Sequence, residues 1–383
     1  MQAQTKRHLI ANRLKDVAAG WPRKDPARRQ LTVALDWTPN TNHTGFFVAA
    51  RRGMYAKRGL AVEIISAADA RYKGSYTSGG DGGKYVTPCD LASAGEATFA
   101  LNSPEGVVGW NLPACGASGR RERTLTAVAA LCQRNTSAVA ARKGIARPRE
   151  LDGKRYASYA ARFEGRIIQR LIQADGGTGD YEECVEPMLG LWDTVLKGEA
   201  DATWVFTCWE GVQAEMSGDD QKLNYFVLED FGIPRACSPC LVAAPATLDA
   251  RADDVRAFLA ATAEGYEWAA AHPEEAAREL VEGAKELCGD DNLDLEMCVR
   301  SQRKLGPAYL DGHGKWGRQT SERWNAYLDW LDKEGLLTTY ANSRQPVKGQ
   351  SATLDGLRAG DVGERIPRDQ VRAEAIFTNE YFE

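Results

Sequence analysis

The stretch LTVALDWTPNTNHTGFFVAARRGMYAKRGL, residues 31–60, decides the fold. Its opening run, LTVAL, is typical of a buried strand, and FFVAARRGMY is typical of a helix. The loop between them offers hydrogen-bonding groups and an indole face, which is the usual composition of a small-molecule pocket. These loop residues are Asp36, Trp37, Asn40 and His43. A plain strand followed by a capped helix is the competing interpretation.

Runs of strand length alternate with runs of helix length along the rest of the chain. The first strand-like runs are residues 31–35, 61–65, 97–101, 124–131 and 137–141. After Gly153 the pattern restarts with KRYAS, two helical runs at 165–174 and 192–197, and the strands DATWVF and YFVL. From Cys240 there is one more strand, CLVAA, and then helical sequence at 252–271, 273–287 and 322–331. This order predicts an α/β protein.

Four segments resemble the thiamine-pyrimidine family, which includes fungal-type pyrimidine synthases and bacterial transporter-associated binding proteins. They are DWTPNTNH with the later GMYAKRGL, TFALNSPEG at 98–106, YASYAARFEGR at 156–166, and LWDTVLKGEADATW at 191–204. The resemblance implies a two-lobe clamp like type II periplasmic binding proteins, with the ligand in the cleft between lobes that close by hinge bending. We expect a basic tail over 1–30, lobe one over 31–135 plus 240–383, and lobe two over 136–239.

The composition suits an ordered protein with two cores, because 43% of its 383 residues are hydrophobic. A net charge of −5 with interspersed signs argues against binding nucleic acid. No run approaches the roughly 20 apolar residues that span a bilayer, so we expect no membrane insertion. The expected partner is a small-molecule ligand, with an ABC transporter permease as a further possibility. The oligomeric state stays open.

Compartment signals favour the cytoplasm. The first 30 residues are basic and lack the apolar core of a signal peptide. Nine cysteines at scattered spacings suit free thiols in a reducing compartment better than a disulfide framework. An organelle or the periplasm remains the alternative if a targeting segment is missing or cryptic.

Further candidate ligand contacts lie near strand ends. Asn102, Ser103 and Glu105 follow one expected strand, where open α/β sheets bind ligands, although Glu105 also suits the first turn of a helix. Aromatic faces and a carboxylate that suit an aminopyrimidine are offered by Trp192, Trp209 and Glu210. We expect the neighbouring Trp204, which lies within a strand, in the core.

The turn over 157–166 joins a strand to a helix start, an arrangement that aims backbone amides at an anion. In the synthase branch that the sequence resembles, the matching loop holds the cofactor phosphate, and here Glu164 and Gly165 match it in part. An ordinary turn with solvated arginines is an equally open interpretation. Tyr159 follows the strand end and is expected to stack on a ligand.

Residues 71–89, RYKGSYTSGGDGGKYVTPC, interrupt the α/β pattern with a glycine-rich and serine-rich segment. We expect a mobile surface loop. Lys84 and Tyr85 come within reach of the cleft if this loop folds over.

Departures from the synthase pattern separate the two branches of the family. The resemblance places Asn102 where the synthase has its cofactor-binding lysine and Gly106 where it has its substrate histidine. Neither residue can perform that chemistry. The cysteine-rich iron segment is reduced to Cys237 and Cys240, which is half a metal site.

We therefore expect a non-catalytic protein, without cofactor, that binds a thiamine-pyrimidine-like heterocycle. The hydroxymethyl aminopyrimidine HMP and a formylaminopyrimidine are the model ligands, in thiamine precursor salvage or biosynthesis. One alternative is a synthase that makes HMP phosphate from pyridoxal phosphate (PLP) and histidine, using iron, with Lys84 and His43 replacing the missing groups. The other alternative is a solute-binding protein for a sulfonate, taurine or nitrate.

Overall fold

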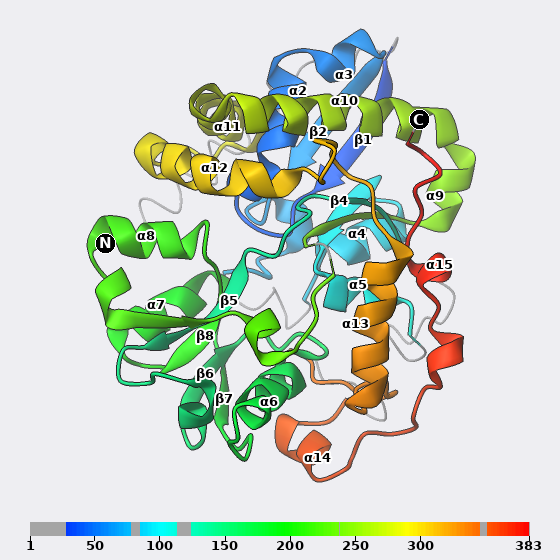
Figure 1. Cartoon of the computed structure of the whole chain (residues 1–383). Helices are drawn as coiled ribbons and strands as arrows, with labels where there is room; N and C mark the ends of the chain where they lie inside the picture. Colours follow the sequence, from blue (N-terminus) through cyan, green and yellow to red (C-terminus); the bar gives the residue numbers. More distant parts are fainter. Residues whose placement is uncertain (1–27, 78–84, 113–123, 237, 345–350, 383) are drawn as a thin grey trace.

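The computed structural model describes residues 28–77, 85–112, 124–236, 238–344 and 351–382. Two five-stranded sheets, one in each lobe, form its framework (Figure 1). The first sheet has the order β2-β1-β3-β10-β4 and contains β1 (Arg29–Ala34), β2 (Leu60–Ile65), β3 (Phe99–Asn102), β4 (Thr126–Ala130) and β10 (Cys240–Ala243). The second has the order β7-β6-β8-β5-β9 and contains β5 (Ser137–Arg142), β6 (Arg155–Ser158), β7 (Glu182–Val185), β8 (Ala202–Phe206) and β9 (Leu223–Phe226).

Both sheets repeat one pairing pattern. Three neighbouring strands run parallel, namely β2-β1-β3 in the first sheet and β7-β6-β8 in the second. The fourth strand of each sheet, β10 or β5, runs antiparallel to its neighbours and is the strand that the chain enters after crossing between lobes. The loops that follow the parallel strands meet at the cleft between the lobes. The predicted fold class, a two-lobe α/β clamp, is confirmed.

Helices cover both sheets, and none in the described ranges is long and apolar enough to cross a bilayer. Their apolar faces are buried; in the second lobe, for example, Ile168, Leu171 and Ile172 pack inward. The first lobe has α2 (Thr44–Arg51), α3 (Met54–Lys57), α4 (Pro88–Ala94), α5 (Pro104–Trp110), α9 (Pro245–Ala250), α10 (Ala252–Ala271), α11 (Pro273–Cys288) and α12 (Leu295–Tyr309). The second lobe has α6 (Glu164–Ala174), α7 (Leu191–Lys197) and α8 (Glu210–Ser217). The C-terminal helices are α13 (Ser321–Lys333), α14 (Leu354–Arg358) and α15 (Ala373–Ile376).

The C-terminal part of the chain contacts both lobes. After α13 it runs along the second lobe, where α14 lies close to α6 (Figure 1). Arg344 donates hydrogen bonds to the carbonyl oxygens of Tyr159 at 2.6 Å and Ser158 at 3.0 Å. Asn342 Nδ2 donates to both carboxylate oxygens of Glu183, at 2.8 and 2.9 Å. These contacts bring residues near position 340 to the edge of the cleft.

The prediction of a mobile surface loop over 71–89 is wrong for its described residues. The side chains of Tyr72, Tyr76 and Val86 are buried in the core. Tyr72 also donates a hydrogen bond to the Leu35 carbonyl oxygen at 2.6 Å. The glycine-rich composition of the segment gave no sign that these side chains are buried. Lys84 lies outside the described residues.

The loop between β1 and α2 is held in place by helices that come from the far end of the sequence. Tyr266 in α10 donates a hydrogen bond to the Asn42 carbonyl oxygen at 2.6 Å, and Tyr309 in α12 donates to the Thr41 carbonyl oxygen. The hydrogen bond from Tyr266 requires α10 to pack closely against α2. A Cβ added at Gly265 in α10 would lie 2.3 Å from the Gly45 carbonyl oxygen in α2.

We predict that Gly265→Ala lowers the free energy of unfolding by roughly 1–3 kcal/mol, because the added methyl group forces α10 away from α2. Urea denaturation measures this effect. Gly211→Ala is the matched control, since the nearest atom to a Cβ there is 3.6 Å away, an ordinary contact. Equal stability of the two variants would contradict the close packing of these helices.

Candidate functional site

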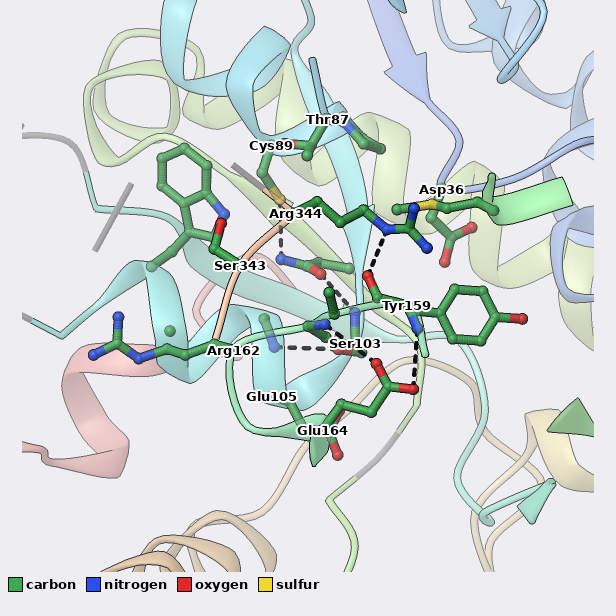
Figure 2. A pocket seen from close by; sticks show the side chains of 18 of the residues that line it. Asp36, Thr87, Cys89, Ser103, Glu105, Tyr159, Arg162, Glu164, Ser343 and Arg344 are labelled. Atoms are coloured by element: carbon green, nitrogen blue, oxygen red, sulfur yellow. Dashed lines mark hydrogen bonds between the residues drawn. The ribbon is translucent and has the colours of Figure 1, made fainter. Parts of the chain in front are cut away.

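A cavity of about 430 Å³ lies between the two lobes (Figure 2). Its walls come from loops after the parallel strands, from the second crossing between lobes, and from the C-terminal segment. The lining includes Asp36, Trp37, Asn102, Ser103 and Glu105 from the first lobe, Tyr159, Arg162, Glu164 and Trp204 from the second, Arg235 from the crossing, and Asn342, Ser343 and Arg344 from the C-terminal segment. A second cavity of about 400 Å³ adjoins the first.

Trp37 stands at the junction of the two cavities. It lines both, together with Tyr159 and Met188. Its indole packs edge-on against Tyr76 and Tyr159, with ring centroids 5.7 and 6.0 Å apart. Tyr76 also lines the first cavity. This aromatic cluster can hold a flat ligand by stacking or edge contacts.

The loop that carries Trp37 is organised around a buried histidine. His43 is fully buried and lines neither cavity; its Nδ1 accepts a hydrogen bond from the Asn40 backbone N–H at 3.2 Å. Nε2 must therefore carry the proton, and it donates to Asp36 Oδ1 at 3.0 Å. Asn40 is also buried and caps the short helix Thr41–His43. Of the four loop residues expected to contact ligand, the structure thus places Asp36 and Trp37 at the cavity, with Asn40 and His43 behind them.

Glu105 and Arg235 form an ion pair in the wall of the first cavity. Only 3% of the Arg235 side chain and 8% of the Glu105 side chain are exposed. The guanidinium lies over the Trp204 ring, 4.8 Å from its centroid. Trp204 was expected in the core. It does lie in a strand, β8, but its side chain also lines the first cavity. No sequence signal marked Arg235, which lies 130 positions from Glu105.

First-lobe residues at the end of β3 and just beyond it hold each other in place. Asn102 donates to the Cys89 Sγ atom at 3.1 Å and accepts from the Ser103 backbone N–H at 2.9 Å. Ser103 caps α5 by accepting from the Gly106 backbone N–H at 3.1 Å. Both residues line the cavity, as the sequence predicts. Among the described residues that line this cavity, none is a lysine.

The cysteine pair gives no described metal site. Cys240 is fully buried in β10, and Cys237 lies outside the described residues. Within the described ranges, no group of three or more histidine, cysteine, aspartate and glutamate side chains is placed to hold a metal ion.

Glu164 lies at the helix start where the sequence suggested an anion-binding site. Its carboxylate accepts hydrogen bonds from the backbone N–H groups of Tyr159 and Ala161, both at 3.2 Å, and from the Tyr156 hydroxyl at 2.9 Å (Figure 2). Burial raises the pKa of this carboxyl to about 7. The turn is therefore capped by its own carboxylate, but its arginines are not solvated as expected, because Arg166 is buried and Arg162 donates to the Thr338 carbonyl oxygen. Gly165, another expected contact, lines neither cavity and faces Tyr181 and Leu354.

The second cavity contains the tryptophans and the carboxylate that the sequence grouped together. Trp192, Trp209 and Glu210 line it, whereas Trp204 lines the first cavity. Glu210 is 8% exposed and accepts a hydrogen bond from the Phe206 backbone N–H at 2.9 Å. Burial raises the pKa of its carboxyl to about 7.

Several cavity residues had no sequence signal or a weak one. Tyr85, from the glycine-rich segment, lines the first cavity and donates to the Met188 Sδ atom at 2.7 Å across the lobes. No strand or motif marks Asn342, Ser343 and Arg344 in the sequence. They reach the cavity only through the path of the folded chain.

Comparisons with known proteins agree with this geometry. A family model described as NMT1/THI5 like matches residues 40–276, which confirms the resemblance found in the sequence. A formylaminopyrimidine-binding protein of Halalkalibacterium halodurans is 24% identical over 86% of this chain and 90% of its own. A putative thiamine biosynthesis protein of Haemophilus influenzae is 25% identical over 65% of this chain and 72% of its own. The periplasmic aliphatic sulphonate binding protein SsuA of Escherichia coli shares the fold, with a TM-score of 0.58, 11% identity, and coverage of 91% and 98%.

We predict that Glu210→Gln stabilises the protein more at pH 8 than at pH 5. The folded-state pKa of about 7 lies above the usual 4.5, so the folded protein holds a proton that the unfolded chain releases. The wild type therefore loses stability as the pH rises from 4.5 through 7, by up to roughly 3 kcal/mol, and glutamine cannot titrate. Urea denaturation at both pH values measures the difference. Glu199→Gln, at an exposed position, is the control; the same pH dependence in both variants would contradict the effect of burial.

Proposed function

This chain belongs to the NMT1/THI5-like family, and we propose that it binds a thiamine-pyrimidine-like heterocycle without catalysing a reaction. HMP and a formylaminopyrimidine are the model ligands. The relative from Halalkalibacterium halodurans, which binds a formylaminopyrimidine by name, supports this choice. A role in thiamine precursor salvage follows from such a ligand.

The charge of the cleft is the observation that carries the proposal. Described carboxylates line both cavities: Asp36, Asp90, Glu105 and Glu164 in the first, and Asp193, Glu210, Asp290 and Asp294 in the second. The described cationic side chains in the same walls are three arginines, 162, 235 and 344. Carboxylates accept hydrogen bonds from the amino group and protonated ring of an aminopyrimidine, and the aromatic residues offer it flat apolar faces.

The three arginines are already engaged by the protein. Arg162 donates to the Thr338 carbonyl oxygen at 2.6 Å, Arg235 pairs with Glu105, and Arg344 donates to backbone carbonyl oxygens of the second lobe. A sulfonate or nitrate would compete with these contacts for the arginines, and it would meet more carboxyl groups than cations among the described residues of the walls. The likeness to SsuA concerns the fold, and the lining disfavours its class of ligand for this chain.

The described residues do not support the synthase alternative, and Lys84, one of its two proposed replacement groups, lies outside them. Asn102 has no amine to bind PLP, and a Cβ at position 106 would lie 2.1 Å from the Asn102 Oδ1 atom. A histidine side chain at Gly106 therefore has no room unless Asn102 moves. His43, proposed as a replacement, is buried behind Asp36.

We predict that Trp37→Ala weakens the binding of HMP or the formylaminopyrimidine about ten- to a hundredfold, because the loss of an aromatic face costs about 1–3 kcal/mol. Isothermal titration calorimetry measures the affinity, and taurine serves as the anionic comparison ligand. Trp330→Ala removes another half-buried tryptophan, one that lines neither cavity, and controls for general destabilisation. Tight taurine binding without aminopyrimidine binding would establish the sulfonate alternative.

We also predict no pyrimidine synthesis. Reduced protein incubated with PLP, ferrous iron and oxygen should release no aminopyrimidine phosphate, and its intact mass should show no loss of a histidine fragment. Borohydride treatment should trap no Schiff base, because the lysine position is Asn102. Product in the small-molecule fraction would replace the binding proposal with the synthase.

A further inference from the structure

The second cavity differs from the first in the charge of its walls. The first cavity has three arginines among its described lining residues. The described lining of the second contains no lysine, arginine or histidine but four carboxyl groups, those of Asp193, Glu210, Asp290 and Asp294. The two cavities adjoin at Trp37, Tyr159 and Met188, which line both. One cleft therefore has a chamber with cationic side chains and, next to it, a chamber whose described walls have none.

Two tryptophans of the second lobe offer flat faces to the second cavity. Trp192 belongs to α7, and Trp209 comes directly before α8. Both residues are half-buried, so part of each remains accessible. Helix α8 lies beside α12 of the first lobe (Figure 1), and the segment that leads into α12 carries Asp290 and Asp294. Aromatic faces combined with negative charge are the usual means by which proteins bind organic cations.

Glu210 is the buried carboxyl group of this cavity. Its Oε2 atom accepts a hydrogen bond from the Phe206 backbone N–H at 2.9 Å, and Phe206 is the one other described residue that donates to this carboxyl group. Among the ion pairs of the described residues, none includes Glu210. Burial raises the pKa of the carboxyl group to about 7, and a cation beside it would favour the ionised form. The cavity wall thus holds a buried acid that lacks a positive partner.

The other three carboxyl groups have neutral or exposed partners. Asp290 Oδ1 accepts hydrogen bonds from the backbone and side chain of Asn292, both at 3.0 Å. Asp294 Oδ1 accepts from the Met297 backbone N–H at 2.7 Å. Asp193 lies 3.6 Å from the ammonium group of Lys197, but 61% of that lysine side chain is exposed, and exposed ion pairs are weak. The excess of carboxyl groups is therefore left for a ligand.

We propose that the second cavity is a binding site for an organic cation, so that the cleft accepts an aminopyrimidine linked to a positively charged ring. Trp192 and Trp209 would contact the faces of the cation, and Glu210 would balance its charge. A metal ion is a poorer match, because no group of three or more potential ligands in the described ranges is placed to hold one. The identity of the heterocycle rests on the proposed function, whereas the cation site rests on the walls of the second cavity.

A pair of ligands that differ only in charge tests the proposal. Thiamine links an aminopyrimidine to a thiazolium cation, and its neutral isostere has carbon in place of the charged ring nitrogen. Calorimetry at pH 8 keeps the Glu210 carboxyl group, with its pKa of about 7, mostly ionised. We expect the wild type to bind thiamine at least about tenfold more tightly than the isostere. Glu210→Gln and Trp209→Ala should each lower that ratio at least about threefold.

Glu215→Gln is the matched control for the loss of charge. Glu215 belongs to the same helix as Glu210, but it lines neither cavity and pairs with Lys304 on the surface. Its ratio of thiamine to isostere affinity should stay close to that of the wild type. If thermal unfolding shows that Trp209→Ala is not folded, Glu210→Gln decides alone, since that variant retains the volume of the side chain.

The thiazolium half of thiamine, methylated at its nitrogen, gives an arm that does not depend on the pyrimidine. Saturation-transfer NMR should detect its binding to the wild type and a weaker signal with Glu210→Gln. Absence of HMP and formylaminopyrimidine binding would refute the proposed function, and this arm would still decide the cation site.

Three results would overturn the cation site. The first is equal wild-type affinity for thiamine and its neutral isostere, and the second is no transfer to the thiazolium ion. The third is an equal fall of the ratio in Glu215→Gln, which would assign the preference to the net charge of the protein instead of the cavity.

Discussion

The buried imidazole of His43 is the contact on which the cleft depends. It accepts from the Asn40 N–H and donates to Asp36, so one side chain joins the two ends of the loop between β1 and α2. Trp37 lies inside that loop and lines both cavities. Because the ring is fully buried, leaving either nitrogen without its partner would cost the desolvation of a polar group. The loop is therefore held in one conformation, and the indole is held with it.

The charges in the cavity walls then determine which ligands the cleft favours. Among the described residues, carboxyl groups outnumber arginines in the walls of both cavities, and each of these arginines contacts another protein group. Two of the carboxylates, Glu164 and Glu210, are buried one in each cavity, and burial raises both pKa values to about 7. A buried carboxylate without a cationic partner is a cost to folding. A ligand that brings amino hydrogens to the cleft would offset part of that cost, whereas an anion would add to it.

The sequence was sufficient to predict the framework. Largely apolar runs such as LTVAL predict strands buried on both faces, and the neighbours Val33 and Ala34, which point to opposite faces, are both fully buried. The motif around Asp36 and Trp37 predicted the family and the loop that borders the cleft. These features are local, since each depends on residue types within a few positions of each other.

The parts that the sequence could not predict depend on the direction of side chains and on contacts between distant positions. His43 and Asn40 face the protein and not the cleft, because Tyr266 and Tyr309 fix the backbone between them. Glu164 turns back onto its own helix start, an outcome that residue types alone leave open. Arg235 and Arg344 reach the cavity from segments with no motif, and only the folded chain brings them there.

Native mass spectrometry of protein purified gently from its natural host would test the central claim most directly. The cleft is proposed to hold an amino-substituted heterocycle without an anionic group, so the bound mass should equal that of a thiamine-pyrimidine precursor free of phosphate. The same mass should be absent from Trp37→Ala prepared in parallel. A bound sulfonate or nitrate would contradict the account, because the cleft is proposed to recognise amino hydrogens through its carboxyl groups and not to bind an anion.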